Sequence, residues 1–193
     1  LLVDRWGLDP SRLYATVHEG DKKLGLSPDD EAADFWKSET SLSPDNILYC
    51  HSKDNFWMMG DTGPCGPCSE IHVDLRSAEE RAKTPGRDLV NEDHPMVMEI
   101  WNLVFIQYNA QTDGSLKALS AKHVDTGMGF ERIVSVLQDT AGSTYDTDLF
   151  RPILDQVAAL SPLEGLESYD SVGATGDDAD RIRVALRVIA DHV

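Results

Sequence analysis

The chain has 193 residues, of which 41% are hydrophobic and 26% charged, and it carries a formal net charge of −17. This composition is ordinary for a soluble globular protein and leaves room for one good-sized domain, or for one domain and the start of another. The 34 acidic residues outnumber the 17 basic ones two to one, which excludes a surface built mainly to hold nucleic-acid phosphates.

The lengths of the apolar runs and the number of cysteines indicate the cellular location of the protein. No stretch approaches the roughly 18 apolar residues of a membrane-spanning helix, so we expect no membrane partner. The chain has three cysteines, Cys50, Cys65 and Cys68. This number is small and odd, whereas a secreted disulfide framework needs several cysteines that can all pair. We therefore expect a reducing, cytoplasmic location.

The amino-terminal part alternates between strand and helix patterns. Residues 13–17 are rich in β-formers and end near the turn-prone pair Gly20-Asp21, which predicts a short strand. Residues 28–37 combine an acidic first turn with helically spaced apolar residues and predict a helix, and a loop is expected over 41–45.

Two strands are predicted on either side of a stretch rich in glycine and proline. They cover residues 56–59 and 70–75, and residues 60–67 between them predict a rigid, sharply turned loop. The following residues 77–95 are polar and charged, so we expect an exposed loop or insertion there.

The longest strand is predicted over residues 97–109, ahead of the turn signal Asp113-Gly114. Its near-continuous apolarity indicates that both of its faces are covered. Two-residue alternation places Asn102 on the same face as Val104. Because a buried side-chain amide must be hydrogen-bonded, Asn102 either completes a core network or faces a ligand pocket.

Helical patterns dominate after a further strand near residues 121–125. Apolar residues at helical spacing predict amphipathic helices over 130–137 and 146–160, and a third helix over 180–193. The Gly-, Ser- and Asp-rich residues 161–180 are predicted to be a linker between the sheet domain and a helical region.

The sequence C-G-P-C at residues 65–68 allows three interpretations. It matches the redox motif of thioredoxins, but a helix should then begin at the second cysteine, and a strand is predicted there instead. A structural zinc site commonly uses two spaced ligand pairs, whereas only Cys50, His51 and His72 lie nearby. We favour thiols packed in a tight loop, and zinc is not expected in this segment.

Residues 124–133 run from a strand through two glycines into an amphipathic helix. Gly127 and Gly129 allow the backbone to approach a ligand, and the start of the helix offers N–H groups to an anion. Arg132 supplies a planar cation suited to phosphate oxygens, and Asp125 is placed to pair with an ammonium group. A tight turn before a capped helix is the plainer interpretation of the same spacing.

Together these stretches resemble a known family. The pattern G-x-G-x-x-R at 127–132 resembles motif 3 of the class II aminoacyl-tRNA synthetases. With N-F-W-x-M-G-D-T-G-P-C-G-P-C at 55–68, E-I-W-N at 99–102 and V-D-T-G-M-G at 124–129, the chain is similar to the alanyl-tRNA synthetases. Further blocks at 145–150 and 187–192 extend the resemblance into the helical region.

The resemblance implies an α+β fold, in which part of a six-stranded antiparallel sheet flanked by helices is followed by the start of a helical domain. Residues 1–160 would be the C-terminal part of the aminoacylation domain and would include motif 3. Residues 181–193 would begin a helical tRNA-recognition region. The implied reaction joins alanine to tRNA(Ala) through an alanyl-adenylate formed from ATP with Mg²⁺, and most of the tRNA would be held outside this chain.

For the amino acid, the resemblance implies a pocket. Asp125 would be a catalytic residue that holds the ammonium group of alanine. Four further residues would shape the pocket for the small side chain: Trp57, Asn102, Val104 and Gly127.

For ATP, the resemblance implies contacts from the motif 3 region. Arg132 would be a catalytic residue that touches the phosphates, together with Gly129, and stabilises charge on the leaving pyrophosphate. Glu99 resembles a magnesium ligand of the class that also meets ATP. Simple alternation points Glu99 away from Asn102, however, so this role requires a β-bulge.

Motifs 1 and 2 of the class have no counterpart in these residues. We expect them upstream of Leu1, so that the chain is an internal fragment of the catalytic domain. Because motif 2 carries the arginine that grips the α-phosphate, we expect no adenylate formation by the chain alone. The alternative function is a non-catalytic, synthetase-like module that binds alanine without transferring it.

Overall fold

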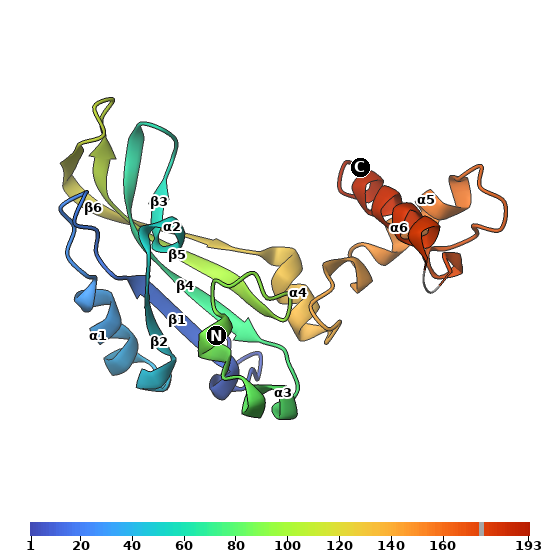
Figure 1. The fold of residues 1–193 in the computed structure, drawn as a ribbon, viewed down its shortest axis with the longest axis horizontal. Coiled ribbons are helices and arrows are strands. Elements are labelled where there is room, and N and C mark those ends of the chain that lie inside the picture. Colours follow the sequence, from blue (N-terminus) through green and yellow to red (C-terminus); the bar gives the residue numbers. More distant parts are fainter. Residues whose placement is uncertain (174–175) are drawn as a thin grey trace. The chain divides into compact units, whose positions relative to one another are not determined.

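The computed structural model describes residues 1–173 and 176–193. Contacts between residues divide the chain into two compact units, Leu1–Gly129 and Phe130–Val193. The first unit holds a sheet with helices, and the second is helical (Figure 1). Part of the predicted linker, residues 174 and 175, lies outside the described residues, and the predicted domain limits stay a prediction.

One six-stranded sheet forms the centre of the first unit, in the order β2-β1-β4-β5-β6 with β3 paired to β4. Four of its pairings are antiparallel, and β1 with β2 is parallel. The sheet is therefore mainly antiparallel with one parallel pair, and the predicted α+β fold is confirmed. A helical crossover between β1 and β2 makes the parallel pair possible. The strands are β1 (Leu13–His18), β2 (Ile47–Cys50), β3 (Phe56–Met58), β4 (Gly63–Asp74), β5 (Val97–Ala110) and β6 (Leu116–Met128).

That crossover contains α1 (Asp30–Glu39), which covers one face of the sheet (Figure 1). Asp29 caps the helix by accepting a hydrogen bond from the Ala32 N–H at 3.1 Å. Buried Ala32 and Ala33 of the helix pack against Val17 of β1. The predicted strand and helix of this region are confirmed, whereas β2 and the short α2 (Ser52–Asn55) were not anticipated.

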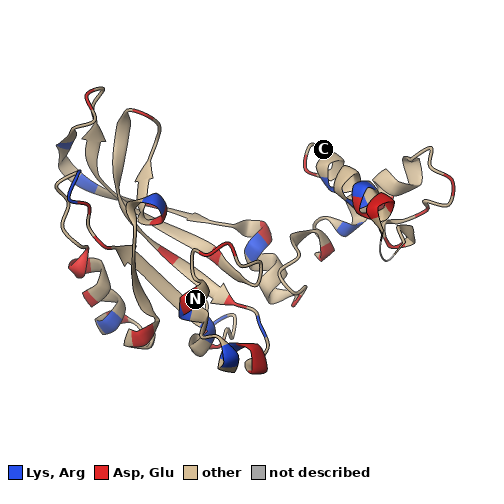
Figure 2. Ribbon diagram, viewed as in Figure 1, with Lys and Arg blue, Asp and Glu red and all other residues tan. Residues whose placement is uncertain are grey.

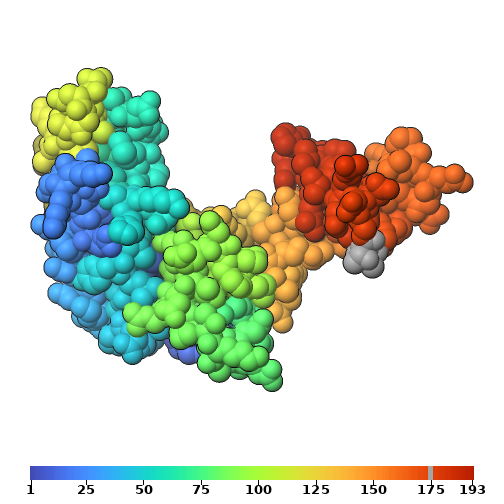
Figure 3. All heavy atoms as spheres, viewed as in Figure 1, coloured from blue at the N-terminus to red at the C-terminus, as the bar shows by residue number. Residues whose placement is uncertain are grey.

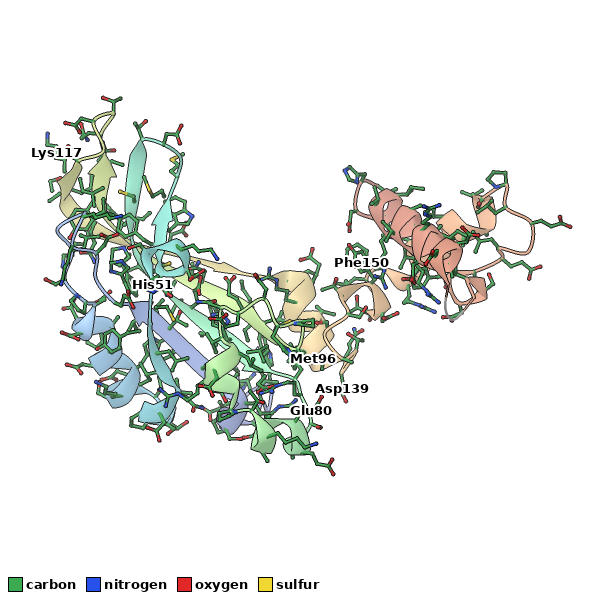
Figure 4. The ribbon with its side chains drawn as sticks, viewed as in Figure 1. His51, Glu80, Met96, Lys117, Asp139 and Phe150 are labelled. Carbon is green, nitrogen blue, oxygen red and sulfur yellow. The ribbon has the colours of Figure 1, made fainter. Side chains whose placement is uncertain are left out.

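Most residues of the segment 77–95 are exposed, as predicted, but the segment contains two short helices and is not only a loop. A capping box between Ser77 and Glu80 starts α3 (Ala78–Lys83), and a 3-10 helix follows at Gly86–Leu89. Val90 is buried against Tyr14 and Val97. Figure 4 shows Glu80 and Met96 at the end of the sheet where this segment docks.

The Gly- and Pro-rich stretch is also corrected, because β4 already begins at Gly63 and includes both cysteines of the C-G-P-C sequence. A Cβ on Gly66 would lie 1.9 Å from the Phe105 carbonyl oxygen. Glycine therefore allows two backbones to approach closely rather than making a turn. A register shift between Cys65 and Cys68 absorbs the irregularity.

The long strand β5 is confirmed, and β6 extends well beyond the predicted residues 121–125. A turn joins them in which Ser115 donates to Asp113 and Gly114 adopts φ 80°. Most β5 side chains are only half-buried, so the expectation of two covered faces is wrong for this chain. The β5–β6 and β3–β4 hairpins lie side by side at one end of the unit (Figure 3), as the pairing of Gly63 with Ala110 requires.

The second unit confirms the helical predictions. Its core contains buried residues of α5, α6 and the segment between them, including Leu154, Tyr169 and Leu186. Arg187 donates to the Tyr169 hydroxyl at 2.7 Å. No helix of the described residues is both long and apolar enough to cross a bilayer. The helices are α4 (Phe130–Leu137), α5 (Arg151–Leu160) and α6 (Asp177–Ala190).

Candidate active site

Five residues that the resemblance assigns to alanine binding line one small cavity of about 170 Å³ in the first unit. Thr126 is the one further residue in its lining. The cavity is formed by β3, β5 and β6, on the sheet face opposite α1. Few charged side chains lie on the central strands of this unit, and most of them lie on helices and loops (Figure 2). The lining residues from the sequence analysis are Trp57, Asn102, Val104, Asp125 and Gly127.

Strand register brings these residues together. Asn102 lies opposite Gly127, and Val104 lies opposite Asp125. Directly paired residues of antiparallel strands point to the same face, so the predicted common face of Asn102 and Val104 is confirmed. Trp57 reaches the cavity from β3, where it pairs with Gly66.

Among the described residues, Asp125 supplies the carboxylate that lines this cavity. Its side chain is exposed, and its Oδ1 accepts a hydrogen bond from the Thr126 N–H at 2.9 Å. The backbone contact restricts the carboxylate and leaves its remaining lone pairs for another donor. The arrangement can hold a cationic group beside a partly apolar wall made by Trp57 and Val104.

The bulge that Glu99 requires is present in β5. Ile71 pairs with Trp101, but the next residue, His72, pairs with Glu99, so Ile100 is the extra residue. This shift places Glu99 on the same face as Asn102. The Gly129 N–H donates to the Ile100 carbonyl at 3.0 Å, which brings the end of β6 beside the bulge.

One carboxylate at this place fits a magnesium ion, because Mg²⁺ is usually held by one or two carboxylates together with substrate phosphates. Among the described residues, no group of three or more His, Cys, Asp and Glu side chains is arranged to hold a metal ion by itself. The role of Glu99 as a magnesium ligand stays a prediction.

Arg132 lies on α4, which begins at Phe130, just after the two glycines. Arg132 is an exposed residue, and its backbone carbonyl accepts a hydrogen bond from the Ser135 hydroxyl at 2.8 Å. Because α4 belongs to the second unit, the contact of Arg132 with phosphates stays a prediction.

A buried polar network beside the cavity was missed by the sequence analysis. Glu70 is 6% exposed, and its Oε2 accepts from Thr16 at 3.3 Å and lies 3.1 Å from the His72 Nε2. Asn55 donates to the Thr16 hydroxyl at 2.7 Å. Glu70 pairs directly with Asn102, so the network lies on the face of the cavity. Its residues are polar positions on separate strands, and no local pattern links them.

The thiols of the C-G-P-C sequence do not suit redox chemistry. Cys65 and Cys68 are buried within β4, and both are free thiols. Burial raises the pKa of Cys68 to about 12 and also raises the pKa of Cys65. A redox-active thiol requires a lowered pKa, commonly at the start of a helix. The thioredoxin-like interpretation is therefore wrong for this chain.

Comparison with known proteins gives an independent result. The family described as tRNA synthetases class II (A) matches residues 1–193. Over the whole chain, 66% of residues are identical to an alanine–tRNA ligase of Salinibacter ruber and 57% to that of Bacteroides thetaiotaomicron. A mitochondrial alanine–tRNA ligase of Saccharomyces cerevisiae is 52% identical.

The chain spans only part of these relatives, covering 20% of each bacterial protein and 18% of the yeast one. The match to the family nevertheless covers every residue of the chain, and the fold is the α+β arrangement of a sheet with helices. The chain belongs to the class II tRNA synthetase (A) family.

Proposed function

We propose that the full-length protein joins alanine to tRNA(Ala) through an alanyl-adenylate made from ATP, and that this chain supplies the alanine pocket and motif 3. The observation that carries the proposal is the gathering of Trp57, Asn102, Val104, Asp125 and Gly127 around one cavity. The names of the relatives, alanine–tRNA ligases of bacteria and of yeast mitochondria, support the same substrate.

In this proposal Asp125 pairs with the ammonium group of alanine, and the small cavity selects the methyl side chain. Its volume is about 170 Å³, and its walls include both Asp125 and the apolar side chains of Trp57 and Val104. Asn102 and Gly127 lie opposite each other on β5 and β6, and Trp57 lines the same cavity from β3. The carboxylate of alanine would remain free for attack on the α-phosphate of ATP.

Adenylate formation needs mainly positioning and charge stabilisation. Arg132 and Gly129 would meet the ATP phosphates, and Glu99 would hold Mg²⁺. The metal, when bound, would neutralise charge on the phosphates. We expect this chain to form no adenylate alone, since residues for the α-phosphate are proposed to lie in motif 2, outside it.

The test is alanine-dependent exchange of pyrophosphate into ATP by the full-length protein, with the variant Asp125→Asn. A charged hydrogen bond is worth about 1.5–3 kcal/mol, so the KM for alanine should rise about ten- to hundredfold. Asp113→Asn is the matched control, because Asp113 lies in the exposed β5–β6 turn and should leave exchange unchanged.

The outcomes separate the candidate functions. Exchange that depends on alanine and collapses only in Asp125→Asn supports the proposal. A folded full-length protein that binds alanine without exchange would instead be the non-catalytic module. Equal loss in Asp113→Asn would contradict the assignment of Asp125 to the ammonium group.

A further inference from the structure

Three lysines line an open groove of about 730 Å³ in the first unit. The groove lies between the loop that follows β1 and the start of α2. Lys22 and Lys23 line it from the loop, and Lys53 lines it from α2. All three are exposed residues, in a chain whose net charge is −17. The groove is therefore a local exception to the acidic composition.

Two carboxylates also line the groove, but both are engaged in holding the loop. Asp21 Oδ1 accepts from the Lys23 backbone N–H at 2.8 Å, and its Oδ2 accepts from the Ser52 hydroxyl at 3.0 Å. The Glu19 carboxylate lies against the Nδ1 of His51. Within residues 1–173 and 176–193, by contrast, no salt bridge involves the side chain of any of the three lysines. Their ammonium groups are therefore available to a negatively charged partner.

A buried histidine fixes the loop to α2. His18 Nδ1 accepts a hydrogen bond from the Gly20 N–H at 3.2 Å, so Nε2 carries the hydrogen and donates to the Ser52 hydroxyl at 2.9 Å. Ser52 in turn donates to Asp21. Backbone hydrogen bonds of 2.8 and 2.9 Å between Asp21 and Leu26 close the turn that carries two of the lysines. The backbone of the three lysines is thus fixed before a partner binds, which lowers the entropy cost of binding.

α2 lies on the face of the sheet that carries the alanine cavity. Val17 packs against α1 on the opposite face, so alternation along β1 directs Thr16 and His18 to the cavity face. α2 contacts both of these residues, because Asn55 donates to Thr16 at 2.7 Å and Ser52 accepts from His18. Figure 1 shows α2 beside β3, and Figure 4 shows His51 at the start of α2.

The same helix leads directly into a wall of the cavity. β3 follows α2 without a break, and its Trp57 lines the cavity. Lys53 therefore precedes this wall residue by four positions. An RNA that accepts alanine must bring its reacting end to the cavity, and the phosphates behind that end must cross the neighbouring surface. Exposed lysines are suited to neutralise such phosphates.

We propose that Lys22, Lys23 and Lys53 hold backbone phosphates at the end of the tRNA that accepts alanine. This inference rests on the proposed function, and it assigns to this chain an RNA contact of its own. It agrees with the acidic composition, since three cations can position one end of an RNA that is held mostly elsewhere. Contacts to phosphates position an RNA and do not read its bases, so nucleotide changes at that end should not alter their contribution.

The experiment measures aminoacylation of a tRNA(Ala) transcript by the full-length protein that carries Lys22→Gln, Lys23→Gln and Lys53→Gln together. Each lost phosphate contact removes about 0.7–0.9 from the slope of log KM for tRNA against log salt concentration, so this slope should fall by about two. At about 0.15 M salt the KM for tRNA should rise about tenfold or more, and Lys53→Gln alone should raise it about three- to fivefold. Alanine-dependent pyrophosphate exchange needs no RNA, so its KM values for alanine and ATP should stay within about twofold.

The matched control replaces three exposed lysines that lie elsewhere on the first unit. It combines Lys37→Gln on α1, Lys83→Gln on α3 and Lys117→Gln near the β5–β6 turn (Figure 4). The control changes the net charge by the same amount as the triple variant. It should leave the KM for tRNA and its salt dependence unchanged, because the effect depends on position and not on total charge.

The outcomes separate this inference from the proposed function. An unchanged KM for tRNA in the triple variant, or an equal rise in the control, would overturn the inference alone. A raised KM for ATP in the exchange reaction would also overturn it, because the groove would then serve the nucleotide. Loss of exchange in the triple variant would show that the lysines support the fold instead. Absence of exchange in the wild type would overturn the proposed function and this inference with it.

Discussion

Gly127→Ala should damage alanine recognition without damaging the fold. A Cβ built on Gly127 meets no heavy atom within 4 Å. Its backbone also avoids the left-handed region that disfavours other residues. Because Gly127 lies opposite Asn102 and lines the cavity, the added methyl group should enter the space proposed for the methyl group of alanine.

The size of the effect follows from steric overlap with bound alanine. An added methyl group that overlaps a neighbouring group in a packed site costs about 1–3 kcal/mol. That cost corresponds to a rise of about five- to hundredfold in the KM for alanine. Glycine lacks the side-chain methyl group, so its exchange should be less affected and the preference for alanine over glycine should fall.

The assay is pyrophosphate exchange with alanine and with glycine, combined with calorimetry of the full-length protein. Gly66→Ala is the matched control, because its Cβ would lie 1.9 Å from the Phe105 carbonyl oxygen and 2.9 Å from its carbon. Forcing β4 and β5 apart should cost about 3 kcal/mol or more, which lowers the temperature of the transition that reports unfolding of this sheet. Gly127→Ala should leave that transition in place.

The reasoning would be refuted if Gly127→Ala lowered the melting temperature as much as Gly66→Ala. It would also be refuted if Gly127→Ala left the preference between alanine and glycine unchanged. In the first case the glycine would serve the fold, and in the second the cavity would not hold the alanine side chain.

Two further predictions concern buried groups. Burial raises the pKa of Cys68 to about 12 and that of Cys50 to about 11, so a thiol reagent at pH 8 should label both far more slowly than in the unfolded protein; rapid labelling of Cys68 would contradict its protonated state. Both thiols have a higher pKa in the folded than in the unfolded protein. Their contribution to the free energy of unfolding is therefore fully present below the unfolded pKa, where both states are protonated, and is lost as the pH rises through about 11–12. Arg76→Met removes the cationic partner of Asp74, which is 0% exposed and lies 2.7 Å from the Arg76 Nη2. The unpaired carboxylate should lower the free energy of unfolding by about 3–5 kcal/mol. An unchanged melting temperature would show that Asp74 finds another partner.

Periodicity predicted the elements that carry most of the cavity. The alternation along β5 placed Asn102 and Val104 on one face, and the pairing with β6 confirms it. The same alternation placed Glu99 on the other face, and only the extra residue Ile100 reverses this. A bulge depends on how two strands register, and that information is not contained in either strand alone.

Composition gave a wrong prediction where glycine allows two strands to approach closely and does not form a turn. Residues 60–67 have the composition of a loop, yet β4 begins at Gly63 and brings Gly66 against the Phe105 backbone. Turn propensity is a local property, whereas this use of glycine follows from contact with a strand about forty residues later. In the largely exposed segment 77–95, the burial of Val90 was missed for a similar reason, because it depends on contact with Tyr14 and Val97.

The polar network explains why the cavity could be predicted only in part. Thr16 and Glu70 are 54 residues apart, and Asn55 reaches Thr16 across 39 residues. Nothing in the sequence distinguishes these polar residues from others. Their role becomes visible only when they are buried, because a buried polar group must find a hydrogen-bond partner. Asn102 illustrates the argument: the sequence left it between a core network and a ligand pocket. In the fold it lies opposite Glu70 of the network and lines the cavity, and its Oδ1 has no hydrogen bond within residues 1–173 and 176–193. A buried polar atom without a partner in a native structure needs an explanation, and the contact of Asn102 with both the network and the cavity is information that only the fold supplies.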